Sequence, residues 1–315
     1  IRWLFSYAPK ISHMSKLASS SHLPKTSYSG VWFLLGALAC FALMDGISKH
    51  VSLEVSISMI IWARYLTQAL LVSAFTLPKH GKAILRTSNL KLQLFRGSLL
   101  VITTSLAVAS LTFMPVGEFT AIVMTTPLFV TLLASRFLNE EVPLIKVLLA
   151  LGGFIGTLMI VRPGSELFTW HLVFPVCLVL VNIVFHLVTG RISKLEDSLT
   201  TLFYTVWTGA FLTSIPLIWF WSTIEYGHLW LELISIGVLG GWGHFLFIRA
   251  FEETPAANLM PYMYAQIAFG IFWGWVIFKH VPDHVSLFGI GLIAILGAVG
   301  SLLPRIQAWL DGRRT

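Results

Sequence analysis

The chain has 315 residues, of which 56% are hydrophobic and only 11% are charged, and its mean hydropathy is +0.82. A soluble globular protein carries about 25% charged residues, so this composition excludes an ordinary water-facing exterior and predicts that much of the surface faces lipid. The net charge of +7 is not gathered into a basic run or a soluble domain, which argues against nucleic-acid binding.

A helix that crosses the hydrocarbon core of a membrane needs about 20 consecutive apolar residues. Ten stretches of the sequence meet this requirement, and the connections between them are too short for a soluble domain. The runs are also too continuous for the alternating strands of a membrane barrel. The sequence therefore predicts an all-α integral membrane protein with ten transmembrane helices, over residues 30–50, 55–77, 92–114, 116–138, 144–162, 168–190, 198–221, 230–250, 256–279 and 284–303.

Lys and Arg residues indicate the orientation, because short cytoplasmic loops carry an excess of them. With the N-terminus inside, seventeen of the 21 Lys and Arg residues are assigned to the cytoplasmic side, Arg96 among them. Only Lys49, Arg162 and Lys279 fall on the opposite side, and Arg64 lies inside a span. This asymmetry predicts that both termini are cytoplasmic.

The segments outside the predicted spans are short and polar. Residues 1–29 form an N-terminal lead-in in which Met14 is a candidate start, and residues 305–315 form a C-terminal tail. The lead-in has no long apolar core followed by a small-residue cleavage site, so no cleaved signal peptide is predicted. Cys40 and Cys177 both lie inside apolar runs and are interpreted as packing residues rather than metal ligands.

The two halves of the chain resemble each other. The segment MPVGEFTAIVMTTPLF (114–129) aligns with TPAANLMPYMYAQIAF (254–269), 140 residues further on. The halves therefore form two five-helix repeats, residues 30–163 and 168–304. Because five is an odd number of spans, the second repeat must enter the membrane from the opposite side, and inverted repeats of this kind are typical of transporters. A duplicated bundle with a purely structural role is the alternative.

Three parts of the sequence carry a resemblance to a known family. They are FALMDGISKH (41–50), WARYL (62–66), and the long run ASLTFMPVGEFTAIVMTTPLFVTLLASRFLNEEV followed by LLALGGFIGTLMIVRPG (109–164). Together they resemble the EamA family of the drug/metabolite transporter superfamily, and the first repeat looks most like its S-adenosylmethionine and riboflavin uptake branch. The resemblance covers residues from about 30 to 304. It implies transport of a small metabolite by alternating access.

Charged residues inside the predicted spans are the first site candidates, since an ionisable group in lipid is costly and usually faces the bundle interior. Asp45 and Arg64 are at depths where they can meet on neighbouring helices, and Lys49 lies one turn from Asp45. Two interpretations stay open. The three residues form a charge lock that sets helix geometry, or Asp45, Arg64 or both contact a charged substrate or a coupling proton.

Other polar, aromatic and Pro residues extend this list. Glu118 follows the start of the fourth span, where it either caps the helix dipole or contacts a substrate amine or a coupling proton. Pro127 and Pro261 are candidates for bending a gating helix. Polar side chains near the midplane need a partner outside their own helix or, for Thr, bond back to their own backbone, and Trp242 either lines the path or packs. The candidate substrate-binding residues are Asp45, Arg64, Thr104, Thr125, Asn182, His186, Trp242, His244, Tyr264 and Gln266.

The sequence contains no motif for a metalloprotease, an α/β-hydrolase or a nucleotide-binding loop, and no cofactor or metal is predicted. The predicted function is secondary active or facilitative transport of a small polar metabolite, such as an amino acid or S-adenosylmethionine, across the inner (plasma) membrane of a bacterium. Its partners are the metabolite, the lipid bilayer and a candidate coupling proton, with no nucleic acid and no obligate protein partner. The alternatives are a membrane-embedded enzyme and a non-transporting membrane subunit.

Overall fold

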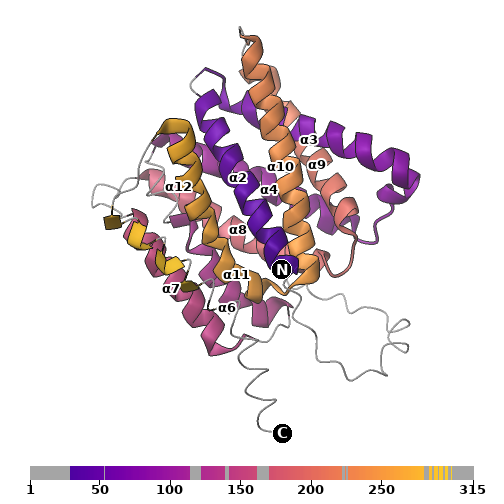
Figure 1. Cartoon of the computed structure of the whole chain (residues 1–315). Helices are drawn as coiled ribbons and strands as arrows, with labels where there is room; N and C mark the ends of the chain where they lie inside the picture. Colours follow the sequence, from indigo (N-terminus) through magenta and orange to yellow (C-terminus); the bar gives the residue numbers. More distant parts are fainter. Residues whose placement is uncertain are drawn as a thin grey trace, which may run out of the picture.

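The structure is a computed structural model, and the residues it describes fall into several ranges. They are 29–52, 54–113, 122–138, 142–161, 170–221, 224, 226–279, 284–285, 287–289, 291–293, 295–296 and 299. Every regular element within these ranges is a helix, and no strand occurs in them (Figure 1). The predicted all-α class is confirmed to this extent.

The helices of the first half of the chain are α2 (Ser29–Val51), α3 (Ile57–His80), η2 (Gly81–Leu85), α4 (Leu90–Phe113), α6 (Thr126–Leu138) and α7 (Leu144–Val161). Those of the second half are η4 (Trp170–Leu172), α8 (Val173–Ile192), α9 (Ser198–Phe220), α10 (Gly227–Glu253), α11 (Ala256–Met263) and α12 (Ala265–Phe278). Within the residues that the structure describes, five helical segments are long and apolar enough to cross a membrane: Ser29–Val51, Ile57–Leu85, Leu90–Ser110, Trp170–Ile192 and Gly227–Glu253.

Two predicted spans differ from the observed helices. The span predicted over 256–279 is divided into α11 and α12 at Tyr264, three residues after the internal Pro261, whose ring cannot continue a regular hydrogen-bond ladder. The described part of the span predicted over 116–138 forms α6 only from Thr126 onward. The first residues of that span lie outside the described ranges, as does most of the span predicted over 284–303.

Helix α2 packs against α10 and α12, and α3 packs against α9 and α10, so that elements far apart in sequence lie side by side (Figure 1). The contact of α2 with α10 depends on Gly243, where an added Cβ would lie 2.6 Å from the Phe41 ring. A larger residue would push the two helices apart, so this close approach requires glycine.

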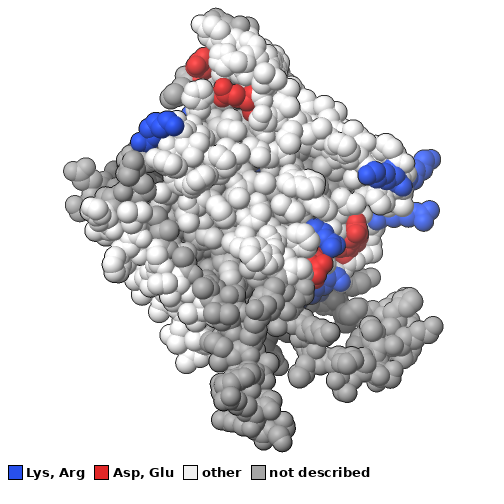
Figure 2. Space-filling view, viewed as in Figure 1, with Lys and Arg blue, Asp and Glu red and all other residues white. Residues whose placement is uncertain are grey.

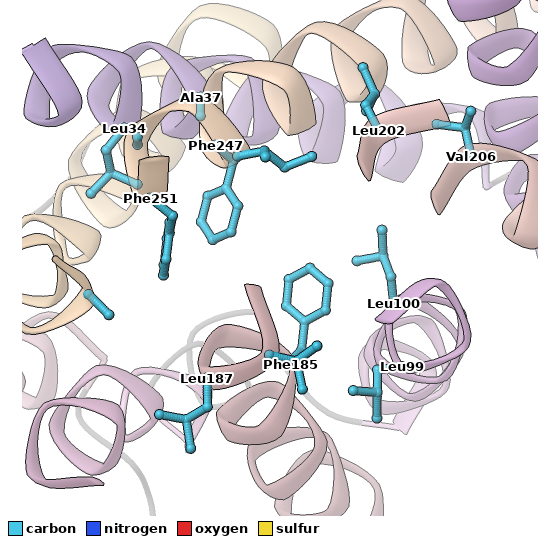
Figure 3. Packing of buried hydrophobic residues seen from close by; sticks show 14 of the residues in the cluster. Leu34, Ala37, Leu99, Leu100, Phe185, Leu187, Leu202, Val206, Phe247 and Phe251 are labelled. Carbon is cyan, nitrogen blue, oxygen red and sulfur yellow. The ribbon is translucent and has the colours of Figure 1, made fainter. Parts of the chain in front are cut away.

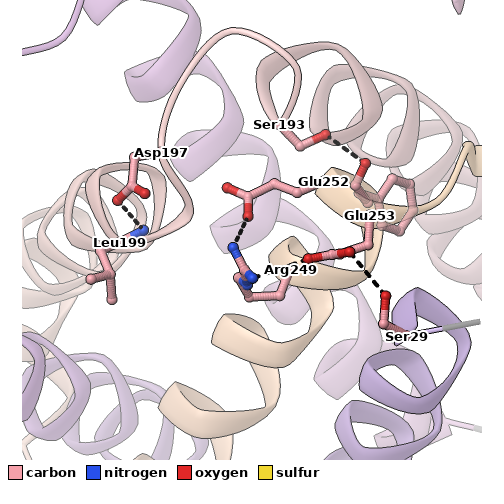
Figure 4. Close-up of polar contacts among 8 residues, drawn as sticks. Ser29, Ser193, Asp197, Leu199, Arg249, Glu252 and Glu253 are labelled. Carbon is pink, nitrogen blue, oxygen red and sulfur yellow. Dashed lines mark hydrogen bonds and ion pairs between the residues drawn. The ribbon is translucent and has the colours of Figure 1, made fainter. Parts of the chain in front are cut away.

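Polar contacts join α2 to α10 at both ends. Ser29 donates to Glu253 (2.9 Å) at one end, and His50 pairs with Glu232 (2.9 Å) at the other. Arg249 also contacts Glu253 (3.1 Å) and Glu252 (2.8 Å), so the end of α10 carries a small charged network (Figure 4). The two helices thus have polar contacts at both ends of their apolar interface.

The largest apolar core lies between α2, α3, α4, α8, α9, α10 and α11. Phe185 of α8 and Phe247 of α10 stack across it with ring centroids 6.3 Å apart (Figure 3). Phe247 also contacts Phe251 one turn along α10, at 4.8 Å. These rings anchor α8 against α10 and form the apolar wall beside the polar groups described below.

Large apolar side chains also cover the outside of the bundle. On α9, Phe211, Ile218 and Trp219 are exposed, and the face seen in Figure 2 has a broad area without Lys, Arg, Asp or Glu. Extended apolar surface of this kind is rare on soluble monomers and marks an interaction surface. Together with the long apolar helices, it is the exterior expected of a protein that faces lipid.

Candidate substrate-binding site

Asp45, Arg64, Gln68 and His244 form a first polar cluster between α2, α3 and α10. Nη2 of Arg64 donates to Nε2 of His244 at 3.1 Å. Arginine has no acceptor atom, so the neutral imidazole accepts at Nε2 and carries its own proton on Nδ1. The charge of Arg64 also acts on the carboxylate of Asp45, whose side chain is exposed. The structure therefore brings three of the predicted residues, Asp45, Arg64 and His244, to one place.

Gln68 is a member of this cluster that the sequence analysis missed. It is fully buried, and among the described residues neither Nε2 nor Oε1 has a hydrogen-bond partner; the same holds for Nε of Arg64 and Nδ1 of His244. Each such group costs about 1–3 kcal/mol if it stays unpaired. The signal that would have found Gln68 is its position four residues after Arg64, which places both on one face of α3.

Gly240 of α10 makes room for the first polar cluster. A Cβ added at Gly240 would collide with Nε2 of Gln68 and would lie 3.2 Å from both Nε of Arg64 and Sδ of Met44. The absence of a side chain at this position thus lets the backbone of α10 approach the polar groups of α3. The backbone of α10 therefore helps to shape the site directly.

A second polar cluster lies between α4, α8 and α9 and consists of Gln93, Arg96, His186, Thr189 and Thr205. Arg96 is fully buried and donates through Nε to Thr189 (2.9 Å) and through Nη1 to Thr205 (2.5 Å). Both hydroxyls in turn donate to backbone carbonyls of their own helices, at 2.8 and 2.7 Å, which leaves them as acceptors for Arg96. The guanidinium carbon also lies 4.8 Å from the Phe185 ring centroid.

The placement of Arg96 corrects the sequence analysis, which counted this residue among the cytoplasmic flanking charges. Its guanidinium is inside the bundle and fully buried, so it gives no information on orientation. Arg96 was counted as a flanking charge although it is the seventh residue of α4, and a residue near the start of a helix can be buried inside the bundle. The cytoplasmic side of this helix end stays a prediction. Gln93, one turn earlier on the same face, was the signal that this end of α4 faces the protein interior.

The two polar clusters adjoin each other. The Tyr65 ring centroid lies 5.7 Å from the guanidinium carbon of Arg64, and its hydroxyl lies 3.3 Å from Oγ1 of the predicted residue Thr104 on α4. His186, also predicted, is buried, and its ring centroid lies 5.7 Å from that of Phe185, the ring next to Arg96. The centre of the bundle thus holds two guanidiniums within a largely apolar surround.

The remaining predicted residues are spread over other elements. Tyr264 is fully buried where α11 meets α12, and its hydroxyl has no hydrogen-bond partner within the described residues. Thr125 donates to the carbonyl of Ile122 (2.7 Å), as expected for a hydroxyl that satisfies its own backbone. Asn182 on α8 and Gln266 on α12 are half-buried. The structure does not join these four to either polar cluster.

Trp242 is 59% exposed and packs on Phe245 of the same helix, so its ring faces outward in this structure. Lys49 is exposed one turn beyond Asp45. Pro127 is buried at the start of α6 and Pro261 is buried within α11. Glu118 lies outside the described residues. Of the described side chains, no group of three or more His, Cys, Asp or Glu is placed to hold a metal ion.

Comparison with known proteins places the chain in a family. The model of the EamA-like transporter family matches residues 28–162 and again residues 173–303. An S-adenosylmethionine uptake transporter of Rickettsia conorii is 27% identical over 274 residues, which cover 85% of this chain and 91% of that protein. A riboflavin transporter of Brucella anthropi is 25% identical over 276 residues, covering 84% and 95%.

A pseudopaline exporter of Pseudomonas aeruginosa is 26% identical over 272 residues, which cover 85% of this chain and 94% of that protein. A solved crystal structure shares the fold with a TM-score of 0.73 at 17% identity, over 87% of this chain and 97% of that one. The chain therefore belongs to the EamA-like transporter family of the drug/metabolite transporter superfamily and is a multi-pass membrane protein that transports a small metabolite.

Proposed function

We propose that the chain is a carrier of a zwitterionic metabolite, such as an amino acid or an amino-acid derivative, and not a membrane enzyme or a non-transporting subunit. The substrate binds at the first polar cluster and crosses by alternating access. The observation that carries this proposal is the set of buried donors and acceptors on Arg64, Gln68 and His244 that have no partner among the described residues.

Those atoms match the two charges of a zwitterion. Asp45 is an exposed acceptor for a cationic group. Nε of Arg64 and Nδ1 of His244 are donors, and the amide of Gln68 supplies one donor group and one acceptor. Buried polar groups are normally paired, so a polar substrate that supplies the missing partners gains hydrogen bonds without breaking existing ones. S-adenosylmethionine, the compound named for the rickettsial relatives, has this chemistry.

The geometry favours substrate contact over a closed charge lock. No direct ion pair joins the described residues Asp45 and Arg64, and Arg64 donates its hydrogen bond to His244 instead. A lock would be expected to close the pair and satisfy both partners. Here the carboxylate stays exposed and the guanidinium keeps an unpaired edge.

The division of the ninth predicted span supports alternating access. Transporter binding sites are commonly built around discontinuous helices, and the chain changes from α11 to α12 at the buried Tyr264, just after Pro261. We propose that Pro261 and Pro127 act where gating helices bend. The two separate family matches support a duplicated chain, and we propose two inverted five-helix repeats, 30–163 and 168–304, with ten spans.

We also propose that the membrane is the bacterial inner membrane and that both termini are cytoplasmic. Basic residues support this orientation: Lys79 and Lys82 follow the apolar part of α3, and Arg191 and Lys194 follow that of α8. A coupling proton is a further proposed partner, and Asp45 is the exposed carboxylate in the first polar cluster that would carry it.

Counterflow in proteoliposomes tests the proposed function. The full chain is reconstituted and assayed with labelled S-adenosylmethionine, riboflavin and a set of amino acids. We expect one zwitterionic compound to exchange, with loss of at least about 90% of the rate in Asp45→Asn and Arg64→Leu and partial activity in Arg64→Lys, because lysine keeps the charge but not the planar donor set.

Matched controls are Glu54→Gln and Arg86→Leu, which remove exposed charges outside the helices of the site and should exchange like the wild type. Exchange that survives both Asp45→Asn and Arg64→Leu would keep the carrier but reduce the first polar cluster to a structural role. Exchange of riboflavin alone, which is not a zwitterion, would contradict the proposed substrate class.

A further inference from the structure

The two buried guanidiniums differ in their counter-charges. Arg64 has the carboxylate of Asp45 nearby. Arg96 contacts two hydroxyls and one aromatic ring, and its Nη2 has no hydrogen-bond partner among the described residues. The helices that surround it, α4, α8 and α9, contain no Asp or Glu in their sequences. Arg96 is thus a buried positive charge without an acidic partner in the helices around it.

The two acidic residues between α8 and α9 are occupied by other partners. Glu196, between α8 and α9, accepts from Thr87 (2.9 Å) and from Ser88 (2.8 and 2.7 Å). Asp197 accepts from the backbone of Leu199 (3.0 Å) as the cap of α9 (Figure 4). Both therefore hold the start of α4 and α9 in place and do not neutralise the guanidinium.

An uncompensated buried charge is costly, since removing a cation from water without a partner costs several kcal/mol. The hydroxyls of Thr189 and Thr205 hold two edges of the guanidinium in a defined orientation, and the Phe185 ring covers it at 4.8 Å. Of the guanidinium nitrogens, Nη2 is the buried one that has no hydrogen-bond partner among the described residues. A site whose donor is already oriented binds its ligand with a smaller loss of conformational entropy.

We propose that Arg96 is a binding position for the carboxylate of the transported metabolite, with Nη2 as the donor. This inference rests on the proposed carrier function and adds a second donor for the negative end of the substrate, beside Nε of Arg64 and Nδ1 of His244 in the first polar cluster. A carboxylate supplies a single negative charge and so balances a single guanidinium.

Two more buried polar atoms of the second polar cluster have no hydrogen-bond partner among the described residues. Oε1 of Gln93 and Nδ1 of His186 have no partner within the described part of the chain, although Nε2 of Gln93 donates to Thr201 (3.3 Å). Gln93 stands one turn before Arg96 on α4, so its oxygen can accept from a donor group, such as an ammonium, next to the carboxylate. The ligand class is therefore a carboxylate with a neighbouring donor.

The alternative role for Arg96 is to fasten α4 to α8 and α9. The two roles predict opposite effects of Arg96→Met, which has a similar stem and no charge. Replacing a buried charge by a well-packed apolar residue is often neutral or stabilising, so a binding role predicts that the ligand-free variant melts at or above the wild-type temperature. A fastening role predicts a clear decrease, because two hydrogen bonds between helices are lost.

The test uses benzoate as a carboxylate probe and benzamide as its uncharged counterpart, at constant ionic strength, with the full chain in detergent. A bound ligand raises the melting temperature by mass action. We expect benzoate to raise the melting temperature of the wild type and of the control Arg86→Met by about 2–4 °C, and benzamide to have no effect. In Arg96→Met we expect the benzoate shift to disappear while the ligand-free protein keeps its stability.

A benzoate shift that persists in Arg96→Met, or no benzoate shift in the wild type, would overturn the inference. If Arg96→Met does not fold, Arg96→Lys replaces it in the test. Lysine keeps the positive charge and should keep the fold, but its shorter side chain should lower the affinity for benzoate at least 10-fold. Counterflow separates the two proposals. Exchange without an Arg96-dependent benzoate shift would support the carrier function and refute the carboxylate site. An Arg96-dependent benzoate shift without exchange of any compound would support the carboxylate site and refute the carrier function.

Discussion

Arg64 donates a hydrogen bond from Nη2 to Nε2 of His244 at 3.1 Å, and this contact joins α3 to α10 across 180 residues of sequence. The imidazole is packed against Phe41 at a centroid distance of 4.8 Å, so its orientation is set by the contact of α2 with α10. The direction of the Arg64 guanidinium therefore depends on the packing of helices from both halves of the chain.

We expect His244 to affect transport through Nε2, the atom that accepts the hydrogen bond from Arg64. We expect His244→Phe to lower the counterflow rate by at least about 10-fold, because Arg64 loses its partner and a buried donor is left unpaired. His244→Gln should keep more of the activity, since the amide oxygen can accept from Arg64. Equal rates for the two variants would show that the hydrogen bond to Arg64 does not matter for transport.

Gly240 should be intolerant of even a methyl group. Gly240→Ala places Cβ against Nε2 of Gln68, and overpacking of this kind costs about 1–3 kcal/mol. We expect a lower free energy of unfolding and at least about 5-fold slower counterflow. Gly241→Ala is the matched control, because its Cβ would lie 3.4 Å from Cγ of Gln68, an ordinary contact. Similar losses in both variants would point to helix propensity as the cause instead.

The interaction energy between the hydroxyls of Tyr65 and Thr104 can be measured. Tyr65→Phe and Thr104→Val each remove one partner of the 3.3 Å contact between α3 and α4 with little change of shape. In a double-mutant cycle of unfolding free energies, we expect a coupling of about 0.5–1 kcal/mol, the range found for hydrogen bonds between membrane helices. A coupling of zero would mean that the two hydroxyls do not bond in the folded protein.

The charged network at the end of α10 should contribute little to stability. Glu253 accepts from Arg249 and Ser29, whereas Glu252 accepts from Arg249, and these side chains are only partly buried. We expect Glu253→Gln and Glu252→Gln to lower the unfolding free energy by less than about 1 kcal/mol each. A loss above about 2 kcal/mol in chemical denaturation would show that this network, and not apolar packing, holds α2 to α10.

Much of the helical framework could be predicted from the sequence. The predicted limits of 30–50, 198–221 and 230–250 lie within a few residues of α2, α9 and α10, because long apolar runs can satisfy their backbone in lipid only as helices. Asp45 and Arg64 could be singled out for the same reason, since a charge inside such a run is costly wherever it lies.

The neighbours of these charges were decided by the tertiary structure. A helix in a membrane bundle is apolar both toward lipid and toward its partners, so hydrophobic periodicity does not show which face is buried. That is why the outward-facing Trp242 was predicted as a site residue and why the buried Gln68 was missed. Arg96 was counted among the flanking cytoplasmic charges for a related reason, because distance from a helix end along the chain does not show whether a side chain is buried within the bundle.

The composition and the spacing of apolar runs thus determined, without any structure, that this chain is a helical membrane protein with charged residues in its interior. Only the packing of α4 against α8 and α9 decided that Arg96 meets Thr189 and Thr205 and, among the described residues, forms no ion pair, and only the approach of α3 to α10 decided that Arg64 meets His244. Helix formation is local and follows from hydrophobicity, whereas the pairing of buried polar groups depends on contacts between residues about 90 to 180 positions apart.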